Sequence, residues 1–338
     1  MDELTREPAL TQGTATGDLA RAIAFLHAFA HRKAPVRRPV PGGFAVLDDR
    51  YPGSYDDNKL IIRETPDDDG PIVRDAPDDN GRIVKETPGD DRLLVWEASE
   101  DNGLTTRPAP GDALERAAEL LMGAADEALA TRAHRLVCID DDQLGTACVP
   151  AFAAAGYEHE TNLVMVFRGP VPTTPPSPAS RAAPQEASQI ASPAATPAGL
   201  AVVEVLGLEE VVAVSRRDWR ESLPEASDET IDALARRVEV RLRGADTVGF
   251  RGVRAPDGEI AARADLYVHG GVAQIESVLT AEAYRGKGYA RTLMYALLAE
   301  VAHAELIFLV ADADDWPRHF YTRLGFETVG RTHAFLRT

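Results

Sequence analysis

Hydrophobic and polar positions along residues 200–338 follow two different periods, and together they predict a mixed α/β region. Strands are expected at 247–254, 260–269 and 272–280, the last two joined by a Gly270-Gly271 turn. A helix is expected from 290 to about 303, because its apolar positions recur on one helical face. The run LIFLVA at 306–311 is apolar at every position, which is typical of a central strand covered on both sides. Helices at 207–222, 227–242 and 315–323 and two final strands complete the prediction.

A second part of the chain precedes this region. Residues 170–199 are rich in Pro, Ala and Ser, and we expect them to form an extended linker between parts 1–169 and 200–338. Residues 56–110 repeat with a period of eleven, as in DDNKLIIRETP, DDDGPIVRDAP and DDNGRIVKETP. Each unit combines an Asp-rich turn with a short β-prone triplet, so we expect a surface insertion of short strands and turns. The spacing lacks the alternating ligands of a calcium loop.

Composition narrows the class of protein. A net charge of −18 over 338 residues argues against non-specific nucleic-acid binding, which needs a basic surface. The two cysteines form no CxxC pair, so neither a disulfide framework nor a metal site is expected. The start MDELTREPALTQGT lacks the apolar core of a signal peptide, and no run is long enough to span a membrane. We therefore expect a cytoplasmic protein without metal.

The stretch YRGKGYARTLMYALLAE at 284–300 carries the clearest chemistry. A strand, a loop with two glycines and three cations, and a helix follow one another. The first turn of a helix has unpartnered N–H groups and partial positive charge, and glycines let an anion approach the backbone. The spacing fits neither GxxxxGK[ST] nor GxGxxG, which excludes a nucleotide protein of the P-loop type. The stretch therefore predicts a phosphate-binding loop.

The sequence here resembles the GNAT superfamily of acyl-CoA-dependent N-acyltransferases. Arg285, Gly288 and Ala290 fit its [QR]xxGx[GA] signature. FYTRLGFETVG fits its Y-x-x-x-G-F element at Tyr321, Gly325 and Phe326. The resemblance covers 200–338 and implies an α/β fold with a mixed central sheet flanked by helices, and acetyl-CoA as co-substrate.

The resemblance also implies roles for particular residues. The pyrophosphate would bind the loop from Arg285 to Ala290, that is Arg285, Gly286, Lys287, Gly288, Tyr289 and Ala290. The pantetheine arm would pair with Val278, Leu279 and Thr280. Asp314 stands where many relatives have a coenzyme-contacting asparagine; Glu282 and Pro317 are further departures from the family pattern.

Two residues are candidates for proton transfer. Tyr321 would protonate the departing thiolate, as the family resemblance implies; the alternative is an aromatic residue with its hydroxyl in water. Glu276 is a candidate base for the amine, in phase with Val278, and its alternative is a polar residue on a half-exposed strand. His319 and His333 are lesser candidates.

Residues 135–168 echo residues 305–337 in sequence. Gly156-Tyr157 corresponds to Gly325-Phe326, but Phe152 stands at the position of Tyr321 and cannot donate a proton. In place of the phosphate loop, before a helix expected near 114–130, the chain reads APGDALERA, with acidic Asp112 and Glu115. We interpret residues 1–169 as a degenerate GNAT-like copy without catalytic activity.

The leading hypothesis is an acetyl-CoA-dependent N-acetyltransferase. It would move an acetyl group to a primary amine of a small molecule or peptide by direct attack in a ternary complex. The alternative is a non-catalytic acyl-CoA-binding sensor or scaffold. The sequence identifies no particular acceptor and leaves a homodimer open.

Overall fold

The computed structural model describes residues 9–66, 110–170 and 202–338. The linker, the later repeat units and the side chains of Asp112 and Glu115 lie outside the described parts. The N-terminal half contains α1 (Ala9–Lys33), β1 (Val36–Val40), β2 (Gly43–Leu47), β3 (Lys59–Ile62), α2 (Pro110–Ala128), β4 (Arg135–Ile139), α3 (Asp142–Ala154) and β5 (Glu158–Phe167).

The C-terminal half follows the predicted order closely. It contains β6 (Val203–Val205), α4 (Leu208–Ser222), α5 (Asp228–Arg236), α6 (Val238–Arg241), β7 (Thr247–Arg254), β8 (Ile260–His269), β9 (Val272–Thr280), a 3₁₀ turn (Glu282–Tyr284), α7 (Tyr289–Glu300), β10 (Leu306–Asp312), α8 (Pro317–Leu324) and β11 (Phe326–Arg337). Three predictions differ from this result. The helix expected at 227–242 is divided into α5 and α6 at Arg237, and the two expected final strands are one strand, β11, with a register irregularity between Thr328 and Gly330.

The third difference concerns the acidic repeat. Its first unit, residues 56–66, is not a surface insertion, because it contains β3, whose Leu60 and Ile62 are fully buried. β3 pairs with β2 on one side and runs parallel to β4 on the other. Hydrophobic burial on both faces therefore overrides the turn-rich character of that unit.

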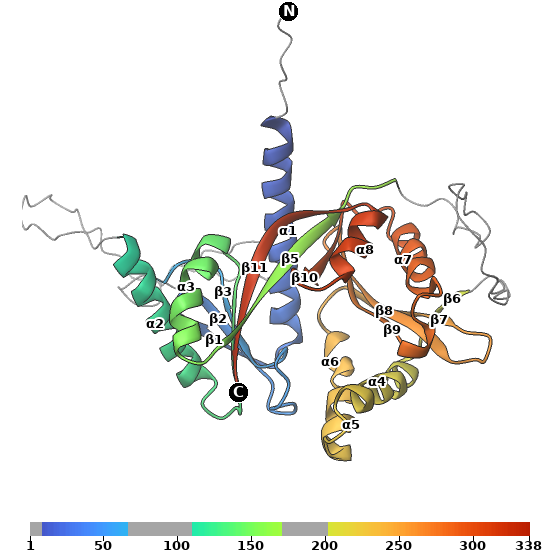
Figure 1. The fold of residues 1–338 in the computed structure, drawn as a ribbon, viewed down its shortest axis with the longest axis horizontal. Coiled ribbons are helices and arrows are strands. Elements are labelled where there is room, and N and C mark those ends of the chain that lie inside the picture. Colours follow the sequence, from blue (N-terminus) through green and yellow to red (C-terminus); the bar gives the residue numbers. More distant parts are fainter. Residues whose placement is uncertain (1–8, 67–109, 171–201) are drawn as a thin grey trace, which may run out of the picture.

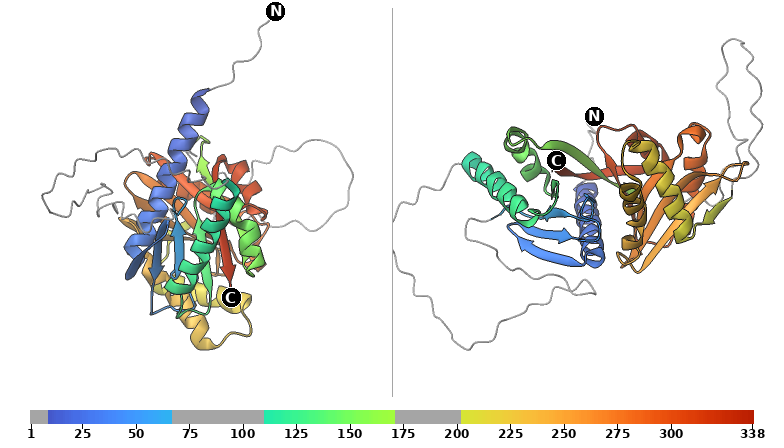
Figure 2. Two further views of the ribbon diagram at one scale, coloured as in Figure 1. Left: turned by 90° about the vertical axis from the view of Figure 1, so that its left-hand side faces the viewer. Right: turned by 90° about the horizontal axis from the view of Figure 1, so that it is seen from below.

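One sheet of 11 strands runs through both halves, in the order β1-β2-β3-β4-β11-β5-β10-β9-β8-β7-β6. Each half ends in a strand, a helix and a strand: β4-α3-β5 in the first and β10-α8-β11 in the second. The final strands are exchanged, because β5 pairs with β10 and β11 pairs with β4, while β5 and β11 pair with each other. Figure 2 shows the two halves on either side of α1, connected by these strands.

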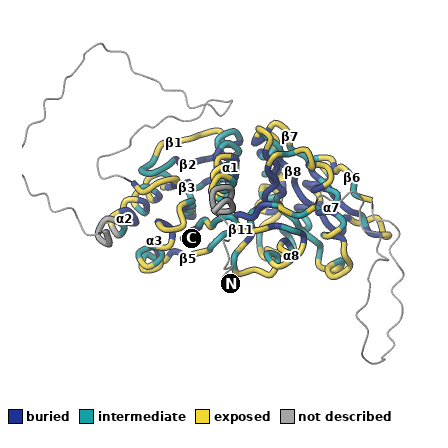
Figure 3. The backbone as a smooth tube through the Cα atoms, turned by 90° about the horizontal axis from the view of Figure 1, so that it is seen from above, coloured by how far each residue is buried: buried dark blue, intermediate teal, exposed yellow. Residues whose placement is uncertain are grey.

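Helices cover both faces of the shared sheet (Figure 1). Side chains alternate along each strand, and on β5 Leu163 and Met165 pack with α7 and α8, whereas Val164 and Val166 pack with α1. Helices α2 and α3 cover the N-terminal strands through a separate core, and α4 to α6 pack over β7 on the α1 face. Burial is concentrated in the strands (Figure 3). The sheet thus forms the rigid support for every element of the site described next.

Candidate active site

The loop between β9 and α7 leaves its backbone open on the outer side. Gly288 is the residue before α7, with φ 91°, and Gly286 has φ 74°, a left-handed conformation that glycine adopts without strain. A Cβ added at either position would meet no atom within 4 Å. No side chain caps α7 and its first turn has no acidic residue, whereas Asp141 caps α3. The first N–H groups of α7 are therefore available to an anion.

Cationic side chains surround this loop. Arg285 donates from Nε to the Thr280 carbonyl at 3.2 Å, and Lys287 donates from Nζ to the Ala283 carbonyl at 2.9 Å. Arg285, Lys287 and Arg291 are all exposed. Among the described residues none of the three forms an ion pair with a carboxylate. Their charge is thus available to a ligand at the loop.

Tyr289 contributes to the loop in a different way from its neighbours. Its side chain is buried in the core beneath α7 and lies edge-on to Tyr284, with ring centroids 6.0 Å apart. Only its main chain is therefore in a position to meet a ligand. Tyr284 in turn donates its hydroxyl to Asp257 at 2.6 Å, which connects the loop to the turn between β7 and β8.

Strands β9 and β10 separate to form a fork. They pair in parallel only where Val272 to Gln274 face Leu306 to Phe308. Beyond that point β9 stays paired with β8 as far as Thr280, and β10 with β5 as far as Asp312. The register of β8 and β9 shifts near Ser277, which has φ 52°. This β-bulge turns β9 away and leaves an edge of backbone polar groups facing the fork.

The sequence-predicted pantetheine strand lies on this open edge. Val278, Leu279 and Thr280 follow the bulge directly and precede the glycine loop. An extended ligand could pair with their main chain as an added strand does. The role of these three residues stays a prediction. Along the chain they lie between the bulge at Ser277 and the glycine loop.

Tyr321 lies on α8, beside the fork. Only 9% of its surface is exposed, and its ring packs against Phe320 and Phe326, with centroids 5.5 and 6.1 Å away. Burial, followed by the negative charges of Glu276 and Asp315, raises the pKa of Tyr321 to about 12. The hydroxyl therefore remains protonated at neutral pH, as a proton donor must be.

The charge of Glu276 acts on Tyr321, although no direct contact joins the two side chains among the described residues. The expectation that Glu276 is in phase with Val278 is wrong, because the bulge at Ser277 places Val278 with Ile275 in the core under α7, whereas Glu276 faces Asp265 across β8. Gln274 donates from Nε2 to the Glu276 carboxylate at 2.7 Å. Burial raises the pKa of Glu276, and the nearby Arg241 guanidinium and the Ser277 N–H oppose that increase. A half-buried carboxyl with a raised pKa is suited to accept a proton near neutral pH.

Two residues of this environment were missed by sequence reasoning. Asp265 is the cross-strand partner of Glu276 on β8, and Arg241 of α6 forms an ion pair with Asp265 while its charge acts on Glu276. The sequence contained one signal of this environment, namely the period-two pattern that puts Gln274 and Glu276 on one face of β9. Arg241 and Asp265 are distant in sequence, so their approach depends on the register of the sheet.

The remaining candidates lie elsewhere. His319 is exposed on α8. His333 is buried on β11 in the N-terminal half, where it bonds to His159 at 3.0 Å and Asp142 at 2.9 Å. Asp314 is exposed; its backbone N–H donates to Asp312 at 2.8 Å, and its charge acts on His159. Nothing in the described chain connects Asp314 with the glycine loop.

Phe152, which the sequence echo sets at the position of Tyr321, is fully buried. Phe152 lies on α3 and packs against Phe335 and Tyr157, with ring centroids 4.4 and 4.9 Å away. Phe335 belongs to β11, the strand received from the C-terminal half. Phe152 therefore forms part of a core that depends on the strand exchange.

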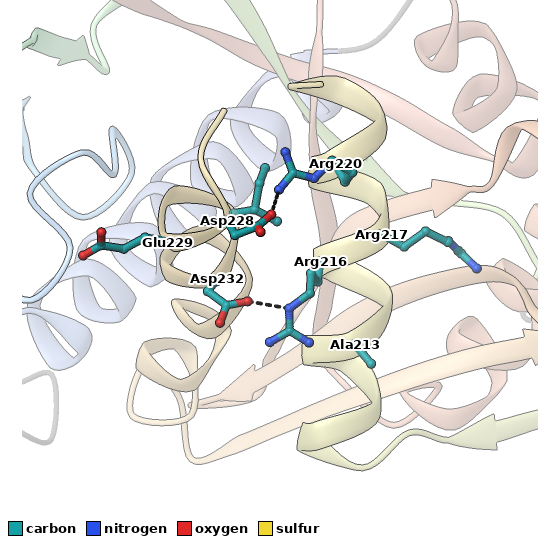
Figure 4. Close-up of a pocket in the computed structure, with 8 residues that line it drawn as sticks. Ala213, Arg216, Arg217, Arg220, Asp228, Glu229 and Asp232 are labelled. Atoms are coloured by element: carbon teal, nitrogen blue, oxygen red, sulfur yellow. Dashed lines mark hydrogen bonds and ion pairs between the residues drawn. The ribbon is translucent and has the colours of Figure 1, made fainter. Parts of the chain in front are cut away.

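A hollow of about 690 Å³ lies between α4 and α5, away from the fork (Figure 4). Arg216 points across it to Asp232, with Nε 2.5 Å from the carboxylate, and Arg220 pairs with Asp228. Arg217 points from the other side of α4 and donates to Glu259. Because these cations are paired and the hollow is open to solvent, we do not place the reaction there.

Two general properties of the described chain bear on function. None of its helices in residues 9–66, 110–170 and 202–338 is both long and apolar enough to cross a membrane. Over the same residues, no three His, Cys, Asp or Glu side chains are grouped so that they would hold a metal ion.

The chain was compared with known proteins. Residues 208–326 match the family described as "Acetyltransferase (GNAT) family". A GNAT-family protein from Novosphingobium aromaticivorans is 22% identical with a TM-score of 0.34, over 53% of this chain and 64% of its own, which is less than two thirds of that protein. A GCN5-related N-acetyltransferase from Kribbella flavida is 13% identical with a TM-score of 0.49, over 94% of each chain.

A tandem GNAT protein from the clavulanic acid biosynthesis pathway is 17% identical with a TM-score of 0.43, over 67% of this chain and 68% of its own. No curated protein matches the chain. The family match begins at the start of α4 and ends at Phe326, the first residue of β11, so it includes the fork, the glycine loop and Tyr321. The chain therefore carries, over residues 208–326, an acetyltransferase domain of the GNAT family.

Proposed function

We propose that this protein transfers an acetyl group from acetyl-CoA to a primary amine of a small molecule or peptide, by direct attack in a ternary complex. The observation that carries the proposal is the convergence of three features at one fork. These are the uncapped glycine loop, the open edge of β9, and the buried Tyr321 hydroxyl, on which the charge of Glu276 acts. A binding module would need the first two, but it would not need the third.

The residues of the loop and the fork fit a CoA thioester. The N–H groups at the start of α7 and the cations around Lys287 would hold the pyrophosphate. The open backbone after Ser277 would pair with the pantetheine arm and polarise the thioester carbonyl through strand N–H groups. Positioning the two reactants side by side would supply much of the rate enhancement.

Proton transfer is assigned to Glu276 and Tyr321. Glu276 accepts a proton from the amine as the new N–C bond forms. As the C–S bond breaks, Tyr321 donates its hydroxyl proton to the sulfur and later regains one from solvent. The raised pKa values suit both roles, because Tyr321 stays protonated until donation and Glu276 becomes a stronger base.

We also propose that the N-terminal half is a non-catalytic copy of the same fold. Support comes from the parallel order β4-α3-β5 and β10-α8-β11, and from Phe152, which is buried at the position of Tyr321. Phe152 has no proton to give. Its half would act through structure, by completing the sheet that carries the active fork.

Thiol release from acetyl-CoA with a panel of amines tests the main proposal. We expect turnover by the full chain with at least one amine, and a large loss in Tyr321→Phe and Glu276→Gln. Acetyl-CoA affinity, measured by calorimetry, should stay nearly unchanged in both variants. Tight acetyl-CoA binding without release of thiol for any amine would instead favour the acyl-CoA sensor or scaffold.

A further inference from the structure

The short helix α6 connects the N-terminal half to the bulge of β9. Arg237 precedes its first residue and donates from Nη1 to Ser54 Oγ at 2.8 Å, across the boundary between the halves. Arg241 is its last residue and donates from Nη1 to Ser277 Oγ at 3.1 Å. Four helical residues rise about 6 Å, so the two arginines that make these contacts lie about one helical turn apart.

The N-terminal loop at this contact is internally braced. The Asn58 amide donates to the carbonyls of Tyr51 and Ser54 at 2.8 and 2.9 Å. Ser54 Oγ donates to Asp57 at 2.6 Å, and Asp57 pairs with buried Lys33 of α1 at 2.9 Å. Loop 51–58 is therefore a rigid surface against which Arg237 rests.

Arg241 bonds to one of two acidic residues that face each other across β8 and β9. Asp265 and Glu276 are direct cross-strand partners, and like charges in that position destabilise a sheet. Asp265 is only 1% exposed, accepts a hydrogen bond from the Tyr267 hydroxyl at 2.7 Å and forms an ion pair with Arg241. The guanidinium thus offsets the repulsion between buried Asp265 and half-buried Glu276.

We infer that Arg241 is a positioning residue for Glu276, and that loop 51–58 of the N-terminal half fixes Arg241 through Arg237 and α6. The inference rests on the proposed function, in which Glu276 is the base. Arg241 would do two things: hold the bulge at Ser277, and keep Glu276 ionised beside Asp265. The N-terminal half would then act on the reaction without touching the substrate.

The charges around Glu276 give the sign of the expected effect. Burial, Asp265 on β8 and Asp56 on the N-terminal loop raise the pKa of Glu276, whereas Arg241 on α6 lowers it. Tyr321 on α8 is neutral at working pH. Removal of the Arg241 charge should therefore raise the pKa of Glu276 further and leave less of the base ionised.

Infrared titration of the carboxyl band tests this inference without substrate. The pKa of Glu276 is obtained as the difference between each full-length chain and the same chain carrying Glu276→Gln. The variants are Arg241→Gln, Arg241→Lys and Ser54→Ala. Arg236→Gln is the matched control, because it removes one positive charge from the neighbouring helix α5, and the ion pair of Arg236 within the described ranges is with Glu239, at 3.3 Å.

We expect the pKa of Glu276 to rise most in Arg241→Gln. It should rise less in Arg241→Lys, which keeps the positive charge but loses the planar guanidinium group, and only slightly in Ser54→Ala. Arg236→Gln should leave it unchanged. At pH 7, kcat/KM for the amine should fall about tenfold in Arg241→Gln, with acetyl-CoA affinity within twofold.

Equal pKa values in Arg241→Gln and Arg236→Gln would overturn the role of Arg241. If Arg241→Gln does not fold, an unchanged pKa in Arg241→Lys has the same meaning. An unchanged pKa in Ser54→Ala would overturn the part assigned to the N-terminal half. Wild-type chain that releases no thiol counts against the proposed function alone, since the titration still decides the role of Arg241.

Discussion

Replacement of Gly288 by alanine tests the phosphate loop directly. Gly288 has φ 91°, and the new Cβ would meet no protein atom within 4 Å. The expected loss of folding stability is therefore only the cost of the left-handed conformation, about 1 kcal/mol. Any larger effect must appear when a ligand arrives, because the methyl group would occupy the space that a phosphate needs to reach the α7 N–H groups.

The loss of affinity follows from the hydrogen bonds that the methyl group blocks. A net hydrogen bond to a charged group contributes about 1.5–3 kcal/mol. Loss of one such bond to the pyrophosphate would weaken acetyl-CoA binding roughly tenfold to a hundredfold. This loss should exceed the stability cost, because the strain is present in both the free and the bound protein.

Calorimetric titration of acetyl-CoA and thermal unfolding separate the two effects. Gly156→Ala is the matched control, since Gly156 has φ 80°, also has open space around its Cβ position, and follows the C-terminal end of α3, outside the glycine loop. Both variants should lose similar stability, but only Gly288→Ala should lose affinity. Binding by Gly288→Ala within twofold of wild type, or an equal loss in Gly156→Ala, would refute the assignment.

Three further outcomes are expected. Tyr321→Phe should lower kcat about a hundredfold with unchanged acetyl-CoA affinity. Because burial raises the pKa of Tyr321 to about 12, wild-type kcat should show no alkaline decline from this residue in the neutral range. Such a decline would contradict the donor role. Glu276→Gln should stabilise the fold at neutral pH. The reason is that a carboxyl whose folded pKa is raised from 4.5 contributes stability below that value and loses it as pH rises through the folded pKa. A difference in Tm from wild type that shrinks between pH 4.5 and 7 would contradict this sign. Phe152→Ala should cost about 3–5 kcal/mol in denaturant unfolding, whereas full stability would show that this core does not depend on the exchanged strand.

Local sequence pattern predicted most of the C-terminal half. The three strands from Thr247 to Thr280 have the predicted bounds, and α7 and β10 differ by a few residues at their ends. These elements have strong periodicity and clear glycine boundaries. The break between α5 and α6 was missed, because Arg237 interrupts no pattern and its conformation depends on contacts such as the one with Ser54.

Long-range pairing limited the rest of the prediction. The pairing of β11 with β4 and of β5 with β10 joins segments from opposite halves, and no local signal encodes such a register. The same limit applied at the fork. Glu276 and Tyr321 were identified from motif positions, but Arg241 and Asp265 became visible only once β8, β9 and α6 were placed together.

The exchanged strands have a consequence for how this chain reaches its native state. While it is synthesised, the N-terminal half lacks β11, so the edge of β4 has no partner until residues 326–337 have left the ribosome. An unpaired edge of that kind is open to association with other chains. We therefore expect nascent or truncated forms to need chaperones, and expression of either half by itself to yield aggregates rather than a smaller folded protein.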